Sequence, residues 1–543
     1  MNSVESTENK TVIVGFDGLD WRYLDRFSDD LEHFTELQYR GVSTDLVSTH
    51  PPWTGSAWPS MYTGVPPDHH GVFDFFDYEN RYPDTAIVVS RADVKAPALW
   101  EYLTEREIAS FVLNLPVTHP VDSTTGVIVP GYIAPEDEPG HPEGIRQEIS
   151  DGIGQPYTIY SEHETSSDLN RKVEGYVDVI DLRGAAAEYL IKSTDWQIGI
   201  VQFQKTDAVF HNSNNSDHFR EVYVAADRAL GRILDACPDG VNVIICSDHG
   251  IGPVDGYQIH VNQILEDHGY LTSSDTVDET WGSFKPTSDD GGENADGGNR
   301  IIDRVVAIAD ALQISPAAAH SIADRLGIAE TLLQMMSSDV RDTLANGVSW
   351  EASQAFCRRQ TEQGIRINLK GRDPAGVVEE HEYETVRTEI IDILSNLRTP
   401  DGKPAFEFVC RREEVYDGPY AEHACDILFL PNEMNHVISP KLFGGRFHPV
   451  DGHDHKKNGV FIAAGPDINE SGVLDELSLI DIAPLALTLL DQPVPEQMVG
   501  AVPESLVPSR TVTRRQYDAS VDHSSYEQDQ DEAKARLSDL GYL

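Results

Sequence analysis

Two adjacent residues, Asp248 and His249, follow an apolar run in the segment NVIICSDHG and offer a carboxylate oxygen and an imidazole nitrogen. An unbroken apolar run of this length is typical of a buried parallel strand. Open α/β sheets bind ligands at the carboxyl ends of such strands. Oxygen and nitrogen donors together suit Zn²⁺ or Mn²⁺. The pair therefore predicts part of a metal site, with a simple polar turn as the alternative.

Four further side chains could complete this metal site, and each lies beside a strand-like run. Asp17 ends the run TVIVGFD, and a carboxylate there is expected at the ligand-binding edge of the sheet. Asp207 and His211 follow the run WQIGIVQF, and their D-x-x-x-H spacing places both on one face of a helical turn. His455 lies in the segment DGHDHKK, just before the run NGVFIAAGP. Each position alone could be a capped turn or a solvated loop, but together they predict a metal centre.

The six side chains divide into two groups of three, enough to hold two divalent cations. One group is Asp17, Asp248 and His249, and the other is Asp207, His211 and His455. Two cations about 4 Å apart stabilise both the attacking and the leaving oxygen of an in-line phosphoryl displacement. The pattern therefore predicts phosphoryl chemistry.

A hydroxyl nucleophile is expected between the two cations, and the segment PPWTGSAWPS contains three hydroxyl side chains. Thr54 lies where a helix is expected to begin, so a phosphate there could also accept hydrogen bonds from backbone N–H groups such as that of Gly55. A cation lowers the pKa of the hydroxyl, so no histidine base is needed. The spacing does not separate Thr54 from Ser56 and Ser60, and Thr54 could instead be a helix cap.

Strand-like and helix-like segments alternate over the first 275 residues. This alternation predicts an α/β fold in which helices cover both faces of a mostly parallel sheet. The runs DILFLP and NGVFIAAGP are expected to rejoin that sheet. We therefore expect a discontinuous core domain made of residues 10–275 and 421–500.

Three other segments are expected outside the core. Residues 276–350 combine an acidic, glycine-rich loop with a helical insert. Residues 351–420 are expected to form a small α+β subdomain. Residues 501–543 form a polar tail that ends in a short helix, which could dock through Leu537, Leu540 and Tyr542.

The chain has 543 residues and a net charge of −50, from 91 acidic and 41 basic residues. This excess predicts a halophilic, cytoplasmic protein whose hydrated acidic surface is screened by salt. It disfavours a nucleic-acid binding surface, which needs basic residues. A hydrophobic content of 40% excludes disorder for most of the chain. From the sequence we expect neither a signal peptide nor a membrane-spanning run.

Five motifs, in order along the chain, resemble the type I phosphodiesterase/nucleotide pyrophosphatase group of the alkaline phosphatase superfamily, in its archaeal form. They are VGFDGLD, WTGSAWPSMYTGVPPDHHGVFDFF, TDAVFH, SDHG and GHDHKKNG, and the resemblance covers roughly residues 10–500. It implies an alkaline phosphatase-like three-layer sandwich with a helical and small α+β insertion. Counting back from Thr63 and Gly64, it implies Thr54 as the nucleophile, and it favours His455 over His453 as the last ligand.

One position departs from that group. Ala57 stands where the nucleotide pyrophosphatases have an asparagine that holds a phosphoryl oxygen. The missing contact is expected from the backbone at Gly55, from Lys205 or from elsewhere. The aromatic nucleotide slot of those enzymes is not traceable, and the sulfatase signature is absent around Thr54.

The resemblance and the ligand set imply a metal-dependent hydrolase of phosphodiester or pyrophosphate bonds that forms a phospho-threonine intermediate. The expected cofactors are two divalent ions, zinc or alternatively manganese, and the expected partner is a small phosphoester. Alternatives within the superfamily are a phosphomonoesterase, a sulfatase or a phosphotransferase. An alternative from another class is a non-catalytic, metal-stabilised binding protein. The sequence does not specify the natural substrate or the oligomeric state.

Overall fold

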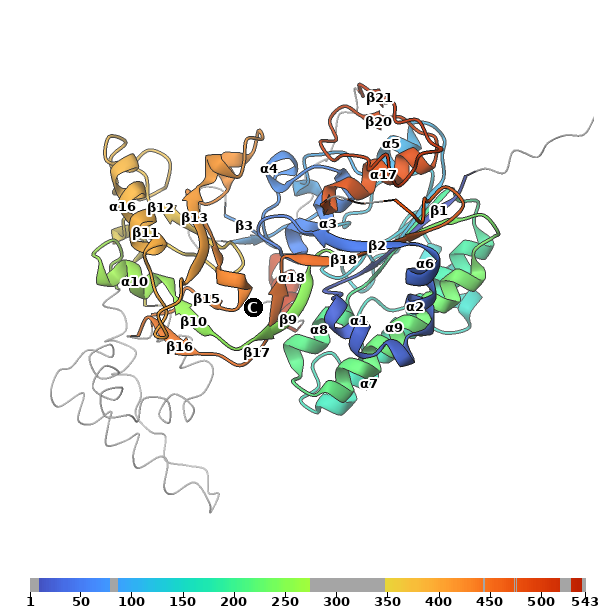
Figure 1. Cartoon of the computed structure of the whole chain (residues 1–543), viewed down its shortest axis with the longest axis horizontal. Coiled ribbons are helices and arrows are strands. Elements are labelled where there is room, and N and C mark those ends of the chain that lie inside the picture. The colour runs from blue at the N-terminus through green and yellow to red at the C-terminus, as the bar shows by residue number, and fades with distance from the viewer. Residues whose placement is uncertain are drawn as a thin grey trace, which may run out of the picture.

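The computed structural model describes residues 9–78, 86–273, 347–442, 445–472, 474, 476–517 and 529–539. The helical insert expected at about 300–346 lies outside the described residues, as do Leu540 and Tyr542 of the tail. The described residues form a large core lobe and a small lobe beside it (Figure 1).

The core lobe contains an eight-stranded, mostly parallel sheet. In spatial order its strands are β19 (Leu477–Ser478), β2 (Val42–Val47), β18 (Asn458–Ala464), β8 (Asn242–Cys246), β1 (Thr11–Phe16), β7 (Ile198–Phe203), β5 (Ser110–Leu113) and β6 (Gly126–Val129). Only β18 runs antiparallel to its neighbours β8 and β2. In the middle of the sheet Val14 of β1 is in register with Ile245 of β8 and Val201 of β7.

Alternate residues of the central strands enter two separate hydrophobic cores, because successive side chains of a strand point to opposite faces. Ile13 packs in the core that also contains Trp58, whereas Val12 and Val14 pack in the core that contains Leu230. The first core includes residues of α3 (Thr54–Thr63), α5 (Leu99–Thr104), α17 (Ile482–Leu489) and α18 (Gln530–Asp539). The second includes residues of α1 (Trp21–Arg26), α2 (Glu32–Arg40), α6 (Ile145–Ile153), α7 (Leu169–Ser193) and α9 (Ser216–Ala236). The predicted α/β three-layer sandwich is therefore confirmed.

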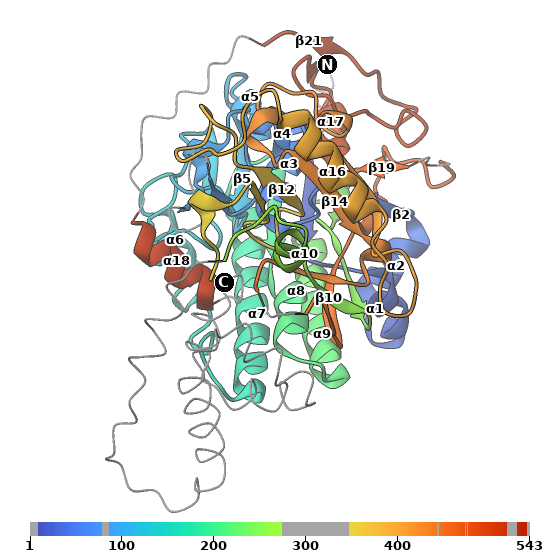
Figure 2. The same cartoon turned by 90° about the vertical axis from the view of Figure 1, so that its left-hand side faces the viewer.

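The small lobe is built around a four-stranded antiparallel sheet with the order β11 (Ala355–Phe356), β12 (Gly364–Ile367), β14 (Ile427–Pro431), β13 (Phe406–Arg411). Helices α10 (Val261–Asp267) and α16 (Tyr383–Ser395) pack in the same hydrophobic core (Figure 2). A three-stranded sheet with the order β15 (Val437–Ser439), β10 (Tyr257–His260), β16 (Phe447–Pro449) completes the small lobe.

The expectation that the run DILFLP rejoins the central sheet is wrong. This run forms β14, which pairs with β12 and β13 of the small lobe. The run NGVFIAAGP forms β18 and does join the central sheet. Both runs are buried, and an apolar run alone does not record which sheet it enters.

The remaining helices and strands are short. They are α4 (Pro67–His70), β3 (Phe76–Asp77), β4 (Ile87–Val88), α8 (Lys205–Asn212), β9 (Gly250–Val254), β17 (Gly452–Lys456), β20 (Val494–Pro495) and β21 (Arg514–Arg515). The C-terminal helix α18 docks as expected through Leu537, which is fully buried. None of the helices in the described ranges is long and apolar enough to cross a membrane.

Candidate metal centre

Three neighbouring parallel strands deliver the candidate ligands to one edge of the central sheet. Asp17 directly follows β1, and Asp248 and His249 lie two and three residues past the end of β8. Asp207 lies in the first turn of α8, which begins two residues after β7. Because β8, β1 and β7 are adjacent and parallel, their carboxyl ends meet at the same place. All four side chains are completely buried.

In the first group, the carboxylates of Asp17 and Asp248 both lie beside one imidazole nitrogen of His249. Nε2 of His249 lies 3.2 Å from Oδ2 of Asp248 and 3.5 Å from Oδ1 of Asp17. One potential ligand atom from each residue lies within 4.8 Å of the others. The structure therefore brings together the first ligand group expected from the sequence.

The second group, Asp207, His211 and His455, is also assembled. Nε2 of His211 lies 3.2 Å from Oδ2 of Asp207, and Nε2 of His455 lies 3.6 Å from Oδ1 of Asp207. The two imidazole Nε2 atoms are 3.1 Å apart. His455 comes from β17, which pairs with β9, the strand that follows His249. This antiparallel pairing brings His455, from the C-terminal part of the chain, to the edge of the central sheet.

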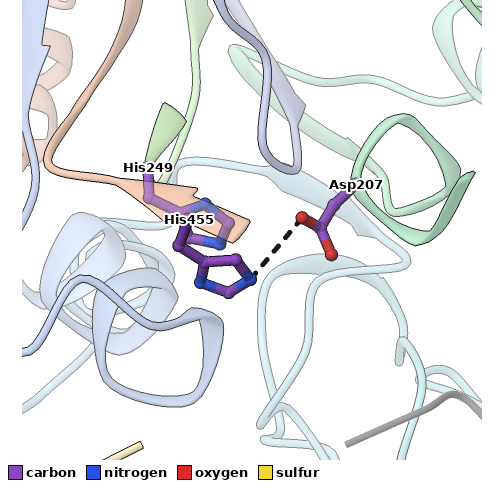
Figure 3. Close-up of side chains that lie close together, drawn as sticks. All are labelled: Asp207, His249 and His455. Atoms are coloured by element: carbon purple, nitrogen blue, oxygen red, sulfur yellow. Dashed lines mark ion pairs between the residues drawn. The ribbon is translucent and has the colours of Figure 1, made fainter. Parts of the chain in front are cut away.

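The two groups are contiguous through stacked histidine rings. The rings of His249 and His455 are stacked with centroids 3.7 Å apart. Asp207, His249 and His455 also form a cluster of potential ligand atoms within 4.8 Å of one another (Figure 3). His249, assigned to one group from the sequence, is therefore within reach of both.

The carboxylates of this site fit a cation. Both carboxylate oxygens of Asp207, and Oδ2 of Asp248, are buried without a hydrogen-bond donor in the described part of the chain. A buried carboxylate without hydrogen bonds or a counter-charge is energetically costly. Nearby imidazole nitrogens add the donors that Zn²⁺ and Mn²⁺ accept. The donor set thus fits the divalent ions expected from the sequence.

A hydrogen bond from Nδ1 fixes the orientation of each of the two stacked imidazole rings. Nδ1 of His249 donates to the carbonyl of Gly250 at 2.9 Å, and Nδ1 of His455 donates to the carbonyl of Pro52 at 3.2 Å. A proton held on Nδ1 leaves the lone pair of Nε2 available, which is the arrangement used by metal-binding histidines. Both Nε2 atoms lie beside the carboxylates described above.

Electrostatics also indicate a deficit of positive charge. Burial, together with the charges of Asp248 and Asp207, raises the pKa of Asp17 well above its usual range. Burial and the charge of Asp207 raise the pKa of Asp248 to about 8. Burial would also raise the pKa of Asp207, but His211 and His455 lower it below its usual value. A cation would relieve the repulsion among these carboxylates.

Among the three hydroxyls of the nucleophile segment, Thr54 is the one that faces the ligands. Its Oγ1 donates to Oδ1 of Asp17 at 3.2 Å and lies 3.1 Å from Nε2 of His249. Ser56 instead donates to the carbonyls of Pro51 and Trp53, and Ser60 donates to the carbonyl of Ser56. Thr54 is the first residue of α3 and Trp53 is its N-cap, so Thr54 is not the cap.

The two candidate substrate-binding residues have different surroundings. Gly55 lies in the first turn of α3 against the backbone of Phe75, and a Cβ at position 55 would lie only 2.7 Å from the Phe75 nitrogen. Lys205 is buried, and its Nζ donates to both carboxylate oxygens of Glu164 at 2.8 Å. The charge of Lys205 is therefore compensated by Glu164 in this structure.

Three residues that the sequence did not predict donate hydrogen bonds to the second carboxylate oxygen of Asp17. Gln202, Tyr132 and Trp58 donate to Oδ2 of Asp17 at 2.9, 3.2 and 3.4 Å. Two of them carried a usable signal. Gln202 is the polar residue in the otherwise apolar run IGIVQF, and Trp58 lies one helical turn after Thr54. Tyr132 lies in a loop and gave no such signal.

The fold is alkaline phosphatase-like, and comparisons with solved structures agree. Phosphonoacetate hydrolase from Sinorhizobium meliloti 1021 superposes with a TM-score of 0.54 at 15% identity, covering 89% of this chain and 96% of that chain. The alkaline phosphatase PafA superposes with a TM-score of 0.51 at 14% identity, covering 92% and 99%. At these identities the likeness concerns the fold.

Sequence comparison identifies the family. The profile described as type I phosphodiesterase / nucleotide pyrophosphatase matches residues 11–454, most of the chain. The protein therefore belongs to the type I phosphodiesterase/nucleotide pyrophosphatase family and is a phosphoric ester hydrolase. A search of curated protein sequences found no match.

Proposed function

We propose that this enzyme hydrolyses phosphodiester or pyrophosphate bonds through a covalent phospho-threonine intermediate on Thr54. The observation that supports this most directly is the position of the Thr54 hydroxyl, in contact with both Asp17 and His249. The candidate ligands are Asp17, Asp248 and His249 for one divalent cation, and Asp207, His211 and His455 for the other. Zinc suits these donors best, with manganese as the alternative.

The chain's own residues position the nucleophile. The hydrogen bond from Thr54 to Asp17 fixes the hydroxyl at the start of α3, so that its oxygen can attack phosphorus in line and displace the leaving alcohol or phosphate. Water then attacks the phospho-threonine and regenerates Thr54. When bound, divalent cations lower the pKa of the hydroxyl and stabilise charge on the phosphoryl oxygens.

The phosphoryl oxygens need donors other than the asparagine that this chain lacks. Ala57 occupies that position in α3 and is fully buried. The N–H groups in the first turn of a helix have no acceptor within the helix, and they favour anions. We propose that the backbone N–H of Gly55 supplies this contact. Lys205 could contribute only if its ammonium leaves Glu164.

The test compares Thr54→Ala with Thr54→Ser at full metal loading. Thr54→Ala should abolish turnover, whereas Thr54→Ser keeps a hydroxyl and should retain measurable activity. Mass spectrometry of acid-quenched wild-type protein should show on Thr54, during turnover, the phosphoryl group together with the substituent that it retains from the substrate. Unchanged activity in Thr54→Ala would remove Thr54 from the mechanism.

A substrate panel separates this proposal from the related reactions. Bis-p-nitrophenyl phosphate, p-nitrophenyl phosphate and p-nitrophenyl sulfate report on diesterase, monoesterase and sulfatase activity, and a dinucleoside polyphosphate reports on pyrophosphatase activity. We expect the diester or the pyrophosphate to be the best substrate at high salt, with Zn²⁺ or Mn²⁺. Preference for a monoester or a sulfate would overturn the proposed bond specificity, and bound metal without any hydrolysis would contradict the catalytic proposal.

A further inference from the structure

A second cluster of potential metal ligands lies where the two lobes meet, separate from the sheet edge. Asp68 and His69 belong to α4 of the core lobe, and Asp417 lies in the segment between β13 and β14 of the small lobe (Figure 1). One potential ligand atom from each residue lies within 4.8 Å of the others. Since 348 positions separate His69 from Asp417, the juxtaposition depends on the packing of the lobes.

Two atoms of this cluster lie at ion-pair distance but do not form a hydrogen bond. Oδ1 of Asp68 and Nδ1 of His69 are 3.3 Å apart, and each is buried with no hydrogen-bond partner in the described part of the chain. The Asp68 side chain is only 2% exposed. Adjacent ligand atoms of a tetrahedral ion with bonds of about 2.0–2.1 Å lie about 3.3 Å apart. The spacing fits two atoms that share a common cation.

The remaining oxygen of Asp68 fixes the segment that carries Asp417. Oδ2 of Asp68 accepts hydrogen bonds from the backbone nitrogens of Asp417 at 3.0 Å and Gly418 at 2.6 Å. The carbonyl of Asp68 also accepts from the backbone nitrogen of Tyr420 at 2.8 Å. The carboxylate is thus held in an orientation that keeps Oδ1 directed away from these bonds.

Gly418 leaves the space that His69 needs. A Cβ at position 418 would lie 2.5 Å from Nδ1 of His69, a distance that real Cβ atoms do not show. The absence of a side chain at position 418 therefore lets the small-lobe segment approach Nδ1 of His69. The neighbouring Tyr416 donates its hydroxyl to the carbonyl of His50, four residues before Thr54. The segment that carries Asp417 thus also contacts the residues just before Thr54.

We propose that Asp68, His69 and Asp417 bind one divalent cation that fastens the small lobe to the core lobe. Two carboxylates and one imidazole are donors suited to Zn²⁺ or Mn²⁺. His69 is partly exposed and Asp417 is exposed, so water completes the coordination and the ion exchanges with solvent. The role of the ion is structural, and it is distinct from the centre beside Thr54.

Asp417→Asn is the variant that tests this site, because Asp417 is exposed and its side chain is not needed for the hydrogen bonds to Asp68. The matched control is Glu422→Gln, which removes another exposed acid from the same segment. Each full-length protein is stripped with a chelator, reloaded with Zn²⁺ or Mn²⁺, desalted and assayed for bound ions by mass spectrometry. Thermal unfolding is measured with and without the same ion.

The wild type and Glu422→Gln should bind one more ion per chain than Asp417→Asn. At saturating ion the wild type should also unfold about 5 °C higher than Asp417→Asn, with no such gap in the metal-free proteins. His69→Asn should show the same loss of one ion. Equal ion content in the wild type and both ligand variants, or stabilisation by Ca²⁺ alone, would overturn the proposal. Since the readouts are ion content and unfolding, they do not depend on the reaction proposed for Thr54.

Discussion

Buried aspartates in the two lobes show opposite ways of placing a carboxylate in the interior. In the small lobe, Asp426 accepts hydrogen bonds from Arg372 at 2.6 and 2.9 Å, and from Tyr383 at 2.8 Å. Burial would raise the pKa of Asp426, but Arg372 lowers it to about 2. At the sheet edge, Asp248 is equally buried but has no cationic side chain of this kind, and its pKa is raised to about 8.

This difference separates a structural carboxylate from a functional one. The charge of Asp426 is compensated within the protein, so its role is complete once the chain has folded. Asp248 keeps an oxygen without a donor in the described part of the chain and also faces the charge of Asp207, so its own charge needs a cation from outside the protein. A buried carboxylate with a strongly raised pKa in a cluster of like charges is the usual mark of a functional site. The predictions below test this contrast.

The largest expected effect is on activity in Asp248→Asn. Asparagine keeps the shape and can still accept the hydrogen bond from the backbone of Gly18, but it removes an anionic ligand. We expect kcat/KM to fall at least about 1000-fold, because several kcal/mol of metal-dependent charge stabilisation is lost. Steady-state kinetics with a diester and a metal assay measure this. Full activity with a full complement of metal would contradict the assignment of Asp248.

The next effect is on stability, in Asp426→Asn. Removing this charge leaves Arg372 and Arg412 without their buried partner, since both contact Oδ1 of Asp426. Breaking a buried ion pair in this way should lower the free energy of unfolding by about 3 kcal/mol. Denaturant unfolding measures it, with Asp401→Asn, an exposed aspartate of the same lobe, as the control. Equal losses in both variants would show that Asp426 has no special role.

The sequence predicted which side chains meet at the edge of the central sheet because each of them lies just after an apolar run. Asp17, Asp248 and His249 each follow an apolar strand, and the carboxyl ends of neighbouring parallel strands must meet. The choice of Thr54 over Ser56 was not local. The spacing left both hydroxyls open and the family resemblance implied Thr54, and the folded segment adds that Ser56 already donates to a backbone carbonyl.

What the sequence could not predict depends on pairing across long separations. The run that forms β14 is as apolar as a core strand, yet its partners are β12 and β13. The stacking of His455 on His249 requires β17 to pair with β9, about 200 residues away. The cluster of Asp68 with Asp417 requires the two lobes to pack. None of these contacts leaves a periodic or spacing signal in the chain.

The pH dependence of metal-free stability should have opposite signs for the two aspartates. Asp426 has a folded pKa of about 2, below its usual value of 3.8, so its stabilising contribution of about 2 kcal/mol is complete above pH 4 and disappears as the pH falls toward 2. Asp248 has a folded pKa of about 8, so its destabilising contribution is absent below pH 4 and grows as the pH rises toward 8.

Urea unfolding of the metal-free wild type, Asp248→Asn and Asp426→Asn from pH 3 to pH 8.5 measures both contributions. Asp248→Asn should match the wild type near pH 4 and become the more stable protein as the pH rises. Asp426→Asn should show its full deficit above pH 4 and a smaller one near pH 3. Parallel curves for all three proteins would contradict the contrast between the lobes. Adding metal should reverse the advantage of Asp248→Asn.

The smallest effect, a loss of metal affinity, is expected from Gln202→Leu. This variant tests whether a hydrogen bond to the carboxylate of Asp17 helps to position it as a metal ligand. Nε2 of Gln202 donates to Oδ2 of Asp17 at 2.9 Å, while its Oε1 accepts from Asn114 at 2.8 Å. Losing this support should weaken metal affinity about tenfold, with near-normal activity at saturating metal. Gln197→Leu, which lies before the other end of the same strand, is the control for a general loss of stability. If both variants lose affinity equally, the hydrogen bond to Asp17 does not tune the metal centre. If only Gln202→Leu does, the uncompensated carboxylates of the core lobe depend on neutral donors for their position and on cations for their charge.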